Sequence, residues 1–416
     1  MLSQNPEATP ASCAEPRLLT AEDDLAAIAD DFGHLVHHRP RAIAPITSTT
    51  DAATAIRYAR RHNLPAVPRG TGHSTAGQSQ ARDGLILDMR PLNTIGEPQD
   101  MRITVGAGAT WHDLTLATLR HGLAPPVLTD YIDITVGGTL SVGGISGTTH
   151  HHGLQTDNVH TLEVITPDGE TTTCSRETRP DLFDAIRAGR GRNGVITHAT
   201  LTLIPAHHRT RLHHAYYRDP HTFLQDQHDL MTSGTAHYIE GHAKPTPTGT
   251  WRYRIEAAYH HNPPTPPDDA LLHTLDHDEL DTTDITYWDF TNRLAEGERL
   301  LRAIGHWTAP HIWANHLLPH HQAAHIITTV MAELTTDDIS ESGTVIIYPF
   351  PTTKIHTPAF PLPAATDTTT LFAILRTIPD ADPATIHTMT TANDSITQLV
   401  TELGGTLYLD SLDTTP

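Results

Sequence analysis

Residues 135–147 read TVGGTLSVGGISG, and five of the last eleven residues of this stretch are glycine. Small hydroxyl residues separate the glycines, so the stretch predicts a surface flat enough to lie against a large planar ligand. A flexible linker is the competing interpretation. A solvated linker has no need of apolar side chains, and this stretch contains Val136, Leu140, Val142 and Ile145.

A second glycine-rich stretch, PRGTGHSTAGQ, covers residues 68–78 and continues a predicted strand at 64–70. Glycines in such a turn let backbone N–H groups converge on a phosphate, because no side chain blocks the approach. The spacing fits neither the G-x-G-x-x-G fingerprint of a Rossmann site nor a Walker loop. For this stretch alone, an ordinary glycine turn between strands is an equal alternative.

The surrounding segments alternate between strand and helix patterns. Thr110 followed by Asp113 predicts a helix start similar to a capping box. The expected strands are 41–47, 64–70, 84–89, 101–108, 162–175 with a turn at 167–169, 195–205, 253–260 and 344–350. The expected helices are 51–63, 110–122 and 180–188, while 371–378 fits either state and 395–410 predicts a helix, a Gly-Gly stop and a last strand.

Charge and composition exclude several classes of protein. The 416 residues carry a formal charge of −21, and this acidic balance argues against a general nucleic-acid binder. No apolar stretch approaches the roughly 20 residues that cross a bilayer, and the first residues lack the pattern of a secretory signal. We therefore expect a cytoplasmic enzyme without nucleic-acid or membrane partners.

Histidine is a weak marker of function here, because the chain contains 32 of them. The run at 150–152 could suggest a metal site. Adjacent side chains on an extended chain point to opposite faces, so three neighbouring histidines rarely bind one ion. We expect no metal, and we expect Cys174 to be inert and Asp157 to cap a turn.

Taken together and in this order, the two glycine-rich stretches resemble the vanillyl-alcohol-oxidase (PCMH) type of FAD-linked oxidases, and cytokinin dehydrogenases most closely. The similar text spans about residues 20–410. It comprises RGTGHSTAGQ (69–78), GLILDM (84–89), TDYIDITVGGTLSVGGISG (129–147), HGLQTDNV (152–159), PDLFDAIRAGRGRNGVIT (180–197), YIEG (238–241), WANHLLP (313–319) and GTVIIYPF (343–350).

The resemblance implies an α+β fold, in which a two-part PCMH-type FAD-binding domain carries an α+β substrate-binding cap domain with an antiparallel sheet. We expect a flexible tail at 1–20, the FAD-binding domain at 21–205, the cap at 206–390 and a truncated return segment to the FAD domain at 391–416. Cytokinin dehydrogenases continue past the counterpart of Tyr408 with a helix and a segment that returns to the flavin, whereas this sequence ends at Pro416. The pyrimidine side of the flavin is therefore expected to be less enclosed, or enclosed by something else.

The implied cofactor is FAD, attached covalently through His73, which is the histidine of the family's GHS motif. The alternative for His73 is a surface histidine in a histidine-rich chain. A second bond through cysteine is not expected, because no cysteine lies between Cys13 and Cys174. Family positions that contact FAD correspond to Gly70, Thr71, Gly72, Ser74, Gln78, Asp130, Thr135, Gly138, Ser141, Ile145, Ile196 and Tyr408.

Asp130 is the expected catalytic base. A partly desolvated carboxylate beside the glycine platform can accept a proton near neutral pH, and in the family this aspartate takes the proton of the substrate amine while a hydride leaves for the flavin. The resemblance also makes Glu240 a catalytic and substrate-contacting residue and places Trp313 at the substrate mouth. The alternatives are a turn-capping residue for Asp130, an exposed strand carboxylate for Glu240 and plain core packing for Trp313.

The predicted function is FAD-dependent, cytokinin-dehydrogenase-like oxidation of a small molecule at a C–H bond next to an amine or a hydroxyl. Oxygen or another acceptor would take the electrons. Two alternatives stay open, because one fold hosts many chemistries. They are oxidation of an alcohol, a sugar or a natural-product intermediate of secondary metabolism, and a non-redox flavoprotein of the same fold.

Overall fold

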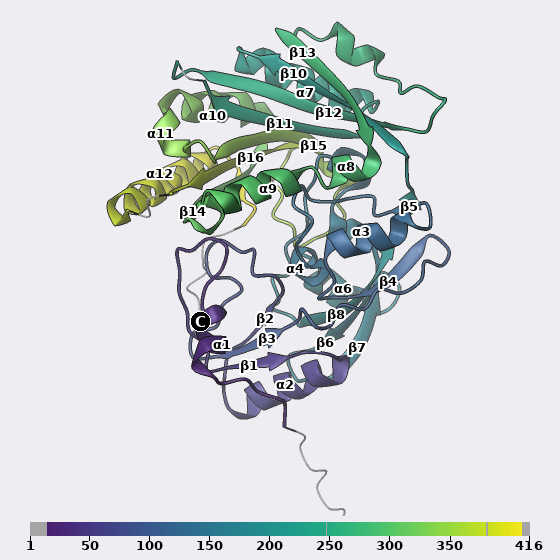
Figure 1. Cartoon of the computed structure of the whole chain (residues 1–416), viewed down its shortest axis with the longest axis vertical. Helices are drawn as coiled ribbons and strands as arrows, with labels where there is room; N and C mark the ends of the chain where they lie inside the picture. The colour runs from purple at the N-terminus through teal and green to yellow at the C-terminus, as the bar shows by residue number, and fades with distance from the viewer. Residues whose placement is uncertain (1–14, 247, 380–381, 410–416) are drawn as a thin grey trace, which may run out of the picture.

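The computed structural model describes residues 15–409 except 247 and 380–381. Figure 1 shows two halves stacked along the long axis, with the N-terminal half below a large twisted sheet. The two ends of the chain lie outside the described residues, and with them most of the expected tail at 1–20 and the last part of the expected return segment at 391–416.

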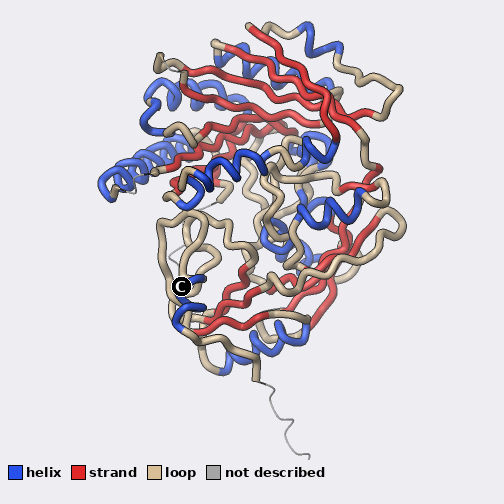
Figure 2. Tube along the Cα trace, viewed as in Figure 1, coloured by secondary structure: helices blue, strands red, loops and turns tan. Residues whose placement is uncertain are grey.

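The lower half contains a parallel sheet of order β1-β3-β2 and an antiparallel sheet of order β4-β8-β6-β7 (Figure 2). Its strands are β1 Ala42–Pro45, β2 Ala66–Arg69, β3 Leu85–Asp88, β4 Arg102–Gly106, β5 Leu123–Ala124, β6 Val159–Ile165, β7 Thr171–Ser175, β8 Val195–Thr202 and β9 Ile204–Pro205. Its α-helices are α1 Glu22–Ala27, α2 Thr49–Arg61, α3 Trp111–Leu119, α4 Val136–Leu140, α5 Thr149–His152 and α6 Pro180–Ile186.

Capping explains where the lower-half helices begin. The Ser48 hydroxyl accepts a hydrogen bond from Asp51 N at 3.2 Å, so α2 begins at Thr49, two residues before the predicted start. In α3, Thr110 Oγ1 accepts from Asp113 N at 3.1 Å, which confirms the start predicted there.

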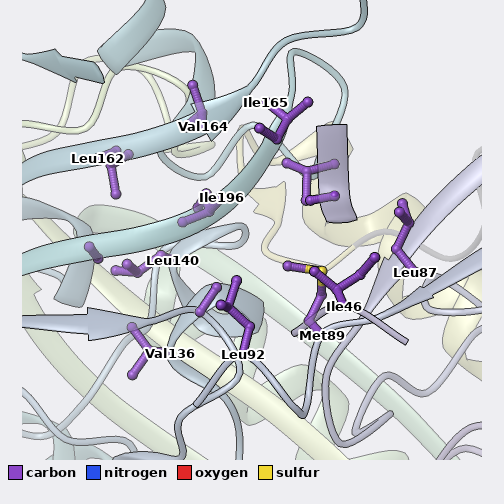
Figure 3. Packing of buried hydrophobic residues seen from close by; sticks show 14 of the residues in the cluster. Ile46, Leu87, Met89, Leu92, Val136, Leu140, Leu162, Val164, Ile165 and Ile196 are labelled. Atoms are coloured by element: carbon purple, nitrogen blue, oxygen red, sulfur yellow. The ribbon is translucent and has the colours of Figure 1, made fainter. Parts of the chain in front are cut away.

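The core of the lower half lies between its sheets and includes the glycine-rich stretch (Figure 3). Val136 and Leu140 of α4 are fully buried and pack in one cluster with Leu162 and Ile196. Burying two aliphatic side chains stabilises the segment by roughly 3 kcal/mol or more. The stretch is therefore an ordered platform, and the linker alternative is wrong.

The upper half is one antiparallel sheet of order β13-β10-β12-β11-β15-β16-β14-β17. Residues 371–378, left open between strand and helix, lie largely in β16. The strands are β10 Arg209–Tyr217, β11 Tyr238–Pro245, β12 Trp251–His261, β13 Glu279–Thr286, β14 His311–Pro319, β15 Thr344–Pro351, β16 Thr368–Thr377 and β17 Thr406–Leu407. The α-helices are α7 Pro220–Ser233, α8 Tyr287–Thr291, α9 Leu294–Ala303, α10 His320–Glu333, α11 Thr336–Ile339 and α12 Pro383–Glu402.

The period-two alternation of the strands decides what each face of this sheet carries. Helices α7, α10 and α12 cover one face, and Ile239 and Ala243 of β11 are buried beneath them. Tyr238 and Glu240, the two neighbours of Ile239 along the strand, therefore point to the other face, which turns toward the lower half. Across the described ranges, no helix combines the length and apolar character needed to cross a membrane.

Candidate active site

The first glycine turn is held by Asp31, a residue that the sequence analysis did not identify. Its carboxylate accepts hydrogen bonds from Gly77 N at 2.7 Å, Ser74 Oγ at 2.8 Å and Gly33 N at 3.2 Å. Burial raises the pKa of Asp31 in spite of these donors. The predicted cofactor residue Ser74 thus has a defined partner, and Asp31 carries no motif that could have revealed it.

The two glycine-rich stretches touch at Gly70 and Thr135, both predicted cofactor contacts. A Cβ built on Gly70 would lie 2.0 Å from Thr135 Oγ1, so only glycine permits this approach. Gly138 also lies against Thr135, 2.9 Å from its Oγ1 when a Cβ is placed there. The backbones of two small-residue turns therefore converge, as a dinucleotide cradle requires.

Buried polar atoms without partners supply a second test of the fit to FAD. Among the described residues, Gln155 Oε1 behind Gly144 and Trp313 Nε1 in the cap are buried without a hydrogen bond. Leaving such atoms unsatisfied costs about 1–3 kcal/mol each. An acceptor and a donor near the boundary between the halves fit a large polar cofactor that would complete their bonding.

The His73 imidazole is enclosed by aromatic rings from both halves. It stacks on Phe32 with ring centres 4.1 Å apart and on Tyr131 with ring centres 4.7 Å apart. The Trp313 ring packs edge-on, with its centre 6.1 Å from that of the imidazole. Burial and the neighbouring His311 lower the pKa of His73 to about 3. His73 is therefore neutral at ordinary pH, and the surface-histidine alternative is wrong.

Three further predicted cofactor residues lie on or above the platform. Ser141 Oγ donates to Gly137 O at 2.7 Å at the end of α4. Tyr408 arrives from the C-terminal segment, and its hydroxyl oxygen accepts from Gly144 N at 3.3 Å. Ile145 packs in the same apolar cluster as Tyr408, between the sheet and the platform. The described part of the C-terminal segment thus reaches the glycine-rich stretch.

The other predicted cofactor residues differ in their surroundings. Ile196 is buried beneath the platform with Leu140 (Figure 3). Thr71 and Gln78 are exposed on the first turn, where Gln78 Oε1 accepts from Ala76 N at 2.9 Å. Gly72 adopts a φ of +75°, a backbone conformation that favours glycine. Their contacts with FAD stay predictions.

Asp130 connects the lower half to the sheet above it. Its Oδ1 accepts hydrogen bonds from the Tyr238 hydroxyl at 2.6 Å and from Arg293 Nη2 at 2.7 Å. Its Oδ2 accepts none from the part of the chain that is described. Both partners are side chains of the upper half, so the turn-capping alternative for Asp130 is wrong.

Glu240 is enclosed rather than exposed, with only 1% of the residue accessible, so the exposed-carboxylate alternative is wrong. Its Oε2 contacts the Tyr238 hydroxyl, and its Oε1 is buried without a partner among the described residues. Burial, with the nearby charge of Asp130, raises the pKa of Glu240 well above its ordinary value, although Arg293 opposes the shift. Burial therefore favours the protonated form of Glu240.

The Tyr238 hydroxyl links the two carboxyl groups. It donates to Asp130 Oδ1 at 2.6 Å and contacts Glu240 Oε2, and its oxygen accepts a hydrogen bond from Arg293 Nη2. The arrangement is a chain from Glu240 through Tyr238 to Asp130.

Trp313 lies on β14 beside the aromatic cluster around His73. Its ring packs edge-on against Phe32 at 5.5 Å and against His311 at 5.8 Å. It is only partly buried, and its Nε1 lacks a partner among the described residues, so plain core packing does not account for it. The predicted place at a substrate mouth is compatible with this position and stays a prediction.

Sequence reasoning missed three charged or polar members of this site: Tyr238, Glu256 and Arg293. A signal existed for Tyr238, because it stands two residues before Glu240 on a strand and so shares its face. Glu256 is the cross-strand partner of Glu240 in the β11–β12 pair. Arg293 precedes α9 and had no signal at all.

Two minor expectations agree with the structure. Asp157 Oδ2 accepts from Leu154 N at 2.9 Å, which confirms a capping role. Cys174 is buried, and burial raises its pKa to about 11, so the thiol is unreactive at neutral pH.

Sequence comparison gives two family matches. Residues 40–175 match the FAD binding domain, and residues 245–415 match the family described as cytokinin dehydrogenase 1, FAD and cytokinin binding. An uncharacterized oxidoreductase, ORF5 in the fasciation locus of Rhodococcoides fascians, is 40% identical over 392 residues, covering 94% of this chain and 88% of that protein. Cytokinin dehydrogenase 4 of Oryza sativa subsp. japonica is 35% identical over 381 residues, covering 80% of this chain and 70% of that one.

Among solved structures, 6-hydroxy-D-nicotine oxidase from Arthrobacter nicotinovorans is similar in fold, with a TM-score of 0.72. The similarity covers 98% of this chain and 92% of that chain at 20% sequence identity. It confirms the expected α+β fold, with an FAD-binding part of the PCMH type below an antiparallel sheet.

Proposed function

The chain belongs to the family of FAD-dependent, cytokinin dehydrogenase-like oxidoreductases, and from this premise we propose that it oxidises a small molecule at a C–H bond next to an amine or a hydroxyl, with Asp130 as the base. One observation carries the proposal. The residue next to Asp130 in the sequence, Tyr131, stacks on His73. Asp130 Oδ1 is held by two hydrogen-bond donors, whereas its Oδ2 accepts no hydrogen bond from the described residues.

When bound, FAD supplies the hydride acceptor. The task of the protein is to place the reacting C–H bond and to remove one proton. Asp130 Oδ2 would accept the N–H or O–H proton while the substrate carbon gives up its hydride, so that a C=N or C=O bond forms. Tyr238 and Arg293 hold Asp130 in place, and water would hydrolyse an imine product.

The residues that would hold FAD are the two turns, Tyr408 and His73. We further propose that His73 carries the cofactor covalently, as the family resemblance implies. Burial keeps this imidazole neutral, with its pKa lowered to about 3, so a ring nitrogen has a free lone pair at physiological pH. The electron acceptor, oxygen or another, and a cytoplasmic location stay predictions from the sequence.

Anaerobic bleaching of the bound flavin tests the proposed reaction. The purified holoprotein would be mixed with an N6-isoprenoid adenine, an amino sugar and an alcohol, and flavin absorbance followed in time. Bleaching by the adenine supports oxidation of a secondary amine, and bleaching by the alcohol or the sugar supports the alternative substrates. Bleaching by none of them would favour a non-redox role.

Asp130→Asn separates chemistry from cofactor binding in the same assay. The amide keeps the shape of the side chain and removes its basicity, so we expect flavin reduction to slow by about 100- to 10,000-fold, the usual contribution of a general base. Flavin content should be close to that of the wild type. An unchanged reduction rate would exclude Asp130 as the base.

A further inference from the structure

Arg293 stands at the N-terminus of α9, which lies at the boundary between the two halves (Figure 1). Its guanidinium is directed at the base rather than at solvent, with 16% of the side chain exposed. It lines a small pocket together with Thr129 and Tyr238, next to Asp130. A residue of the upper half is therefore held beside Asp130.

The fork of Arg293 contacts three carboxyl groups. Its Nη2 donates to Asp130 Oδ1 at 2.7 Å and to Glu240 Oε2 at 3.4 Å, and its Nε donates to Glu256 Oε1 at 2.8 Å. The plane of the group lies over the Tyr238 ring at 4.8 Å and the Phe290 ring at 4.7 Å. Such a fixed, two-ended grip suits a guanidinium and not an ammonium group.

A count of charges shows what this grip does. Glu256 has a second cationic partner, Arg254 Nη2 at 3.5 Å, and its Oε2 also lies 3.2 Å from His214 Nε2. Asp130 has Arg293 as its cationic partner. The three carboxyl groups of Asp130, Glu240 and Glu256 thus face two guanidinium groups, those of Arg254 and Arg293. Loss of Arg293 would remove one of these two positive charges, and Asp130 would keep no ion-pair partner among the described residues.

We propose that Arg293 is a positioning residue that holds Asp130 Oδ1 and aims the other carboxylate oxygen at the substrate, and that it thereby couples the position of α9 to the proton-accepting step. This inference rests on the proposed role of Asp130. Helix α9 also carries Glu298, which forms a hydrogen bond with Tyr131. The segment from Arg293 through α9 therefore contacts both Asp130 and the next residue, Tyr131.

Other ionisable groups face Arg293 from the sheet. Besides Tyr238 and the three carboxyl groups, they are His214, His242, Arg254 and His260, while Tyr348 lies near Glu240. Burial lowers the pKa of His242 to about 4, so this imidazole contributes no charge at neutral pH.

Three variants test the proposal through the pH profile of anaerobic flavin reduction by the N6-isoprenoid adenine. In Arg293→Gln the rise of the rate with pH should move to higher pH by about one unit or more, because a neighbouring opposite charge shifts carboxyl ionisation by that amount. Arg293→Lys should keep the wild-type profile with a lower maximal rate. Arg299→Gln, a matched change of an exposed arginine on the same helix, should leave both unchanged.

Infrared difference spectroscopy of protonated carboxyl groups needs no substrate and separates this inference from the proposed reaction. The wild type should show a buried protonated-carboxyl band that Glu240→Gln removes, and Arg293→Gln should add a second band at a pH at which the wild type does not show it. Flavin content and circular dichroism would confirm that each variant is folded. A wild-type band pattern and pH profile in Arg293→Gln would overturn the proposal, as would the same changes in Arg299→Gln.

Discussion

Replacing Gly70 with alanine tests the contact on which the cofactor cradle depends. The new Cβ would lie 2.0 Å from Thr135 Oγ1, 2.8 Å from its Cγ2 and 2.9 Å from its Cβ. A rotamer change at Thr135 cannot relieve all three contacts, because Cβ does not move with χ1. The backbone at the start of α4 must therefore shift away from the first turn.

Overpacking of this kind costs about 1–3 kcal/mol. For a cooperative unit of 150–250 residues that loss lowers Tm by about 2–12 °C. Because the shift separates two predicted FAD-contacting turns, we also expect less flavin per protein. The assay is thermal unfolding followed by circular dichroism, together with the ratio of flavin to protein absorbance after purification.

Two companion variants make this result specific. Thr135→Ala removes Oγ1 and Cγ2, and with them two of the three close contacts. The loss of unfolding free energy in the double variant Gly70→Ala/Thr135→Ala should therefore be smaller, by about 1 kcal/mol, than the sum of the losses in the two single variants. Gly297→Ala adds a methyl group in open space on α9, and it should raise stability by about 0.5–1 kcal/mol without changing flavin content. A Gly70→Ala protein with the Tm and flavin content of the wild type would refute the reasoning, and strictly additive losses would exclude Thr135 as the obstacle.

Three further predictions concern the side chains of the site. Acid-precipitated and washed wild-type protein should stay yellow, whereas His73→Ala should give a colourless pellet. The control His311→Ala, which alters a neighbouring buried imidazole, should give a yellow pellet. A colourless wild-type pellet would contradict the covalent bond without contradicting FAD binding. Relative to the wild type, Glu240→Gln should become more stable as pH rises from about 5 to 8. The pKa of Glu240 is raised in the folded protein, so with rising pH the unfolded chain loses the Glu240 proton before the folded protein does. The wild type therefore loses stability above the ordinary pKa of glutamate, and the glutamine variant does not. Glu256→Gln should show the opposite trend. Burial acts to raise the pKa of Glu256, but Arg293 and His214 outweigh it and lower this pKa in the folded protein. The ionised Glu256 therefore stabilises the wild type above the ordinary pKa of glutamate, and this contribution is lost on acidification. Thermal unfolding at several pH values measures both, and parallel curves for Glu240→Gln and the wild type would contradict the raised pKa of Glu240.

Local patterns in the sequence predicted much of the lower half. The start of α3 followed from Thr110 and Asp113, because a cap is a contact between residues three apart. The platform was predicted from its glycines and small hydroxyl residues, with its apolar residues arguing against a linker, and the pair Asp130 and Glu240 came from the resemblance. Secondary structure at 371–378 could not be decided locally, since its apolar run fits either state until neighbouring strands supply the hydrogen bonds.

By itself, the sequence determined the two glycine turns, the position of Asp130 between them along the chain and the family to which the chain belongs. These depend on short-range constraints, because a backbone that must approach closely accepts only glycine. Tertiary structure alone decided that Asp31 ties the first turn, that Tyr238 joins two carboxyl groups and that Arg293 closes the charge balance from α9. Charge compensation acts between groups that burial brings together from distant parts of the chain, 163 residues apart for Arg293 and Asp130, and no local pattern encodes it.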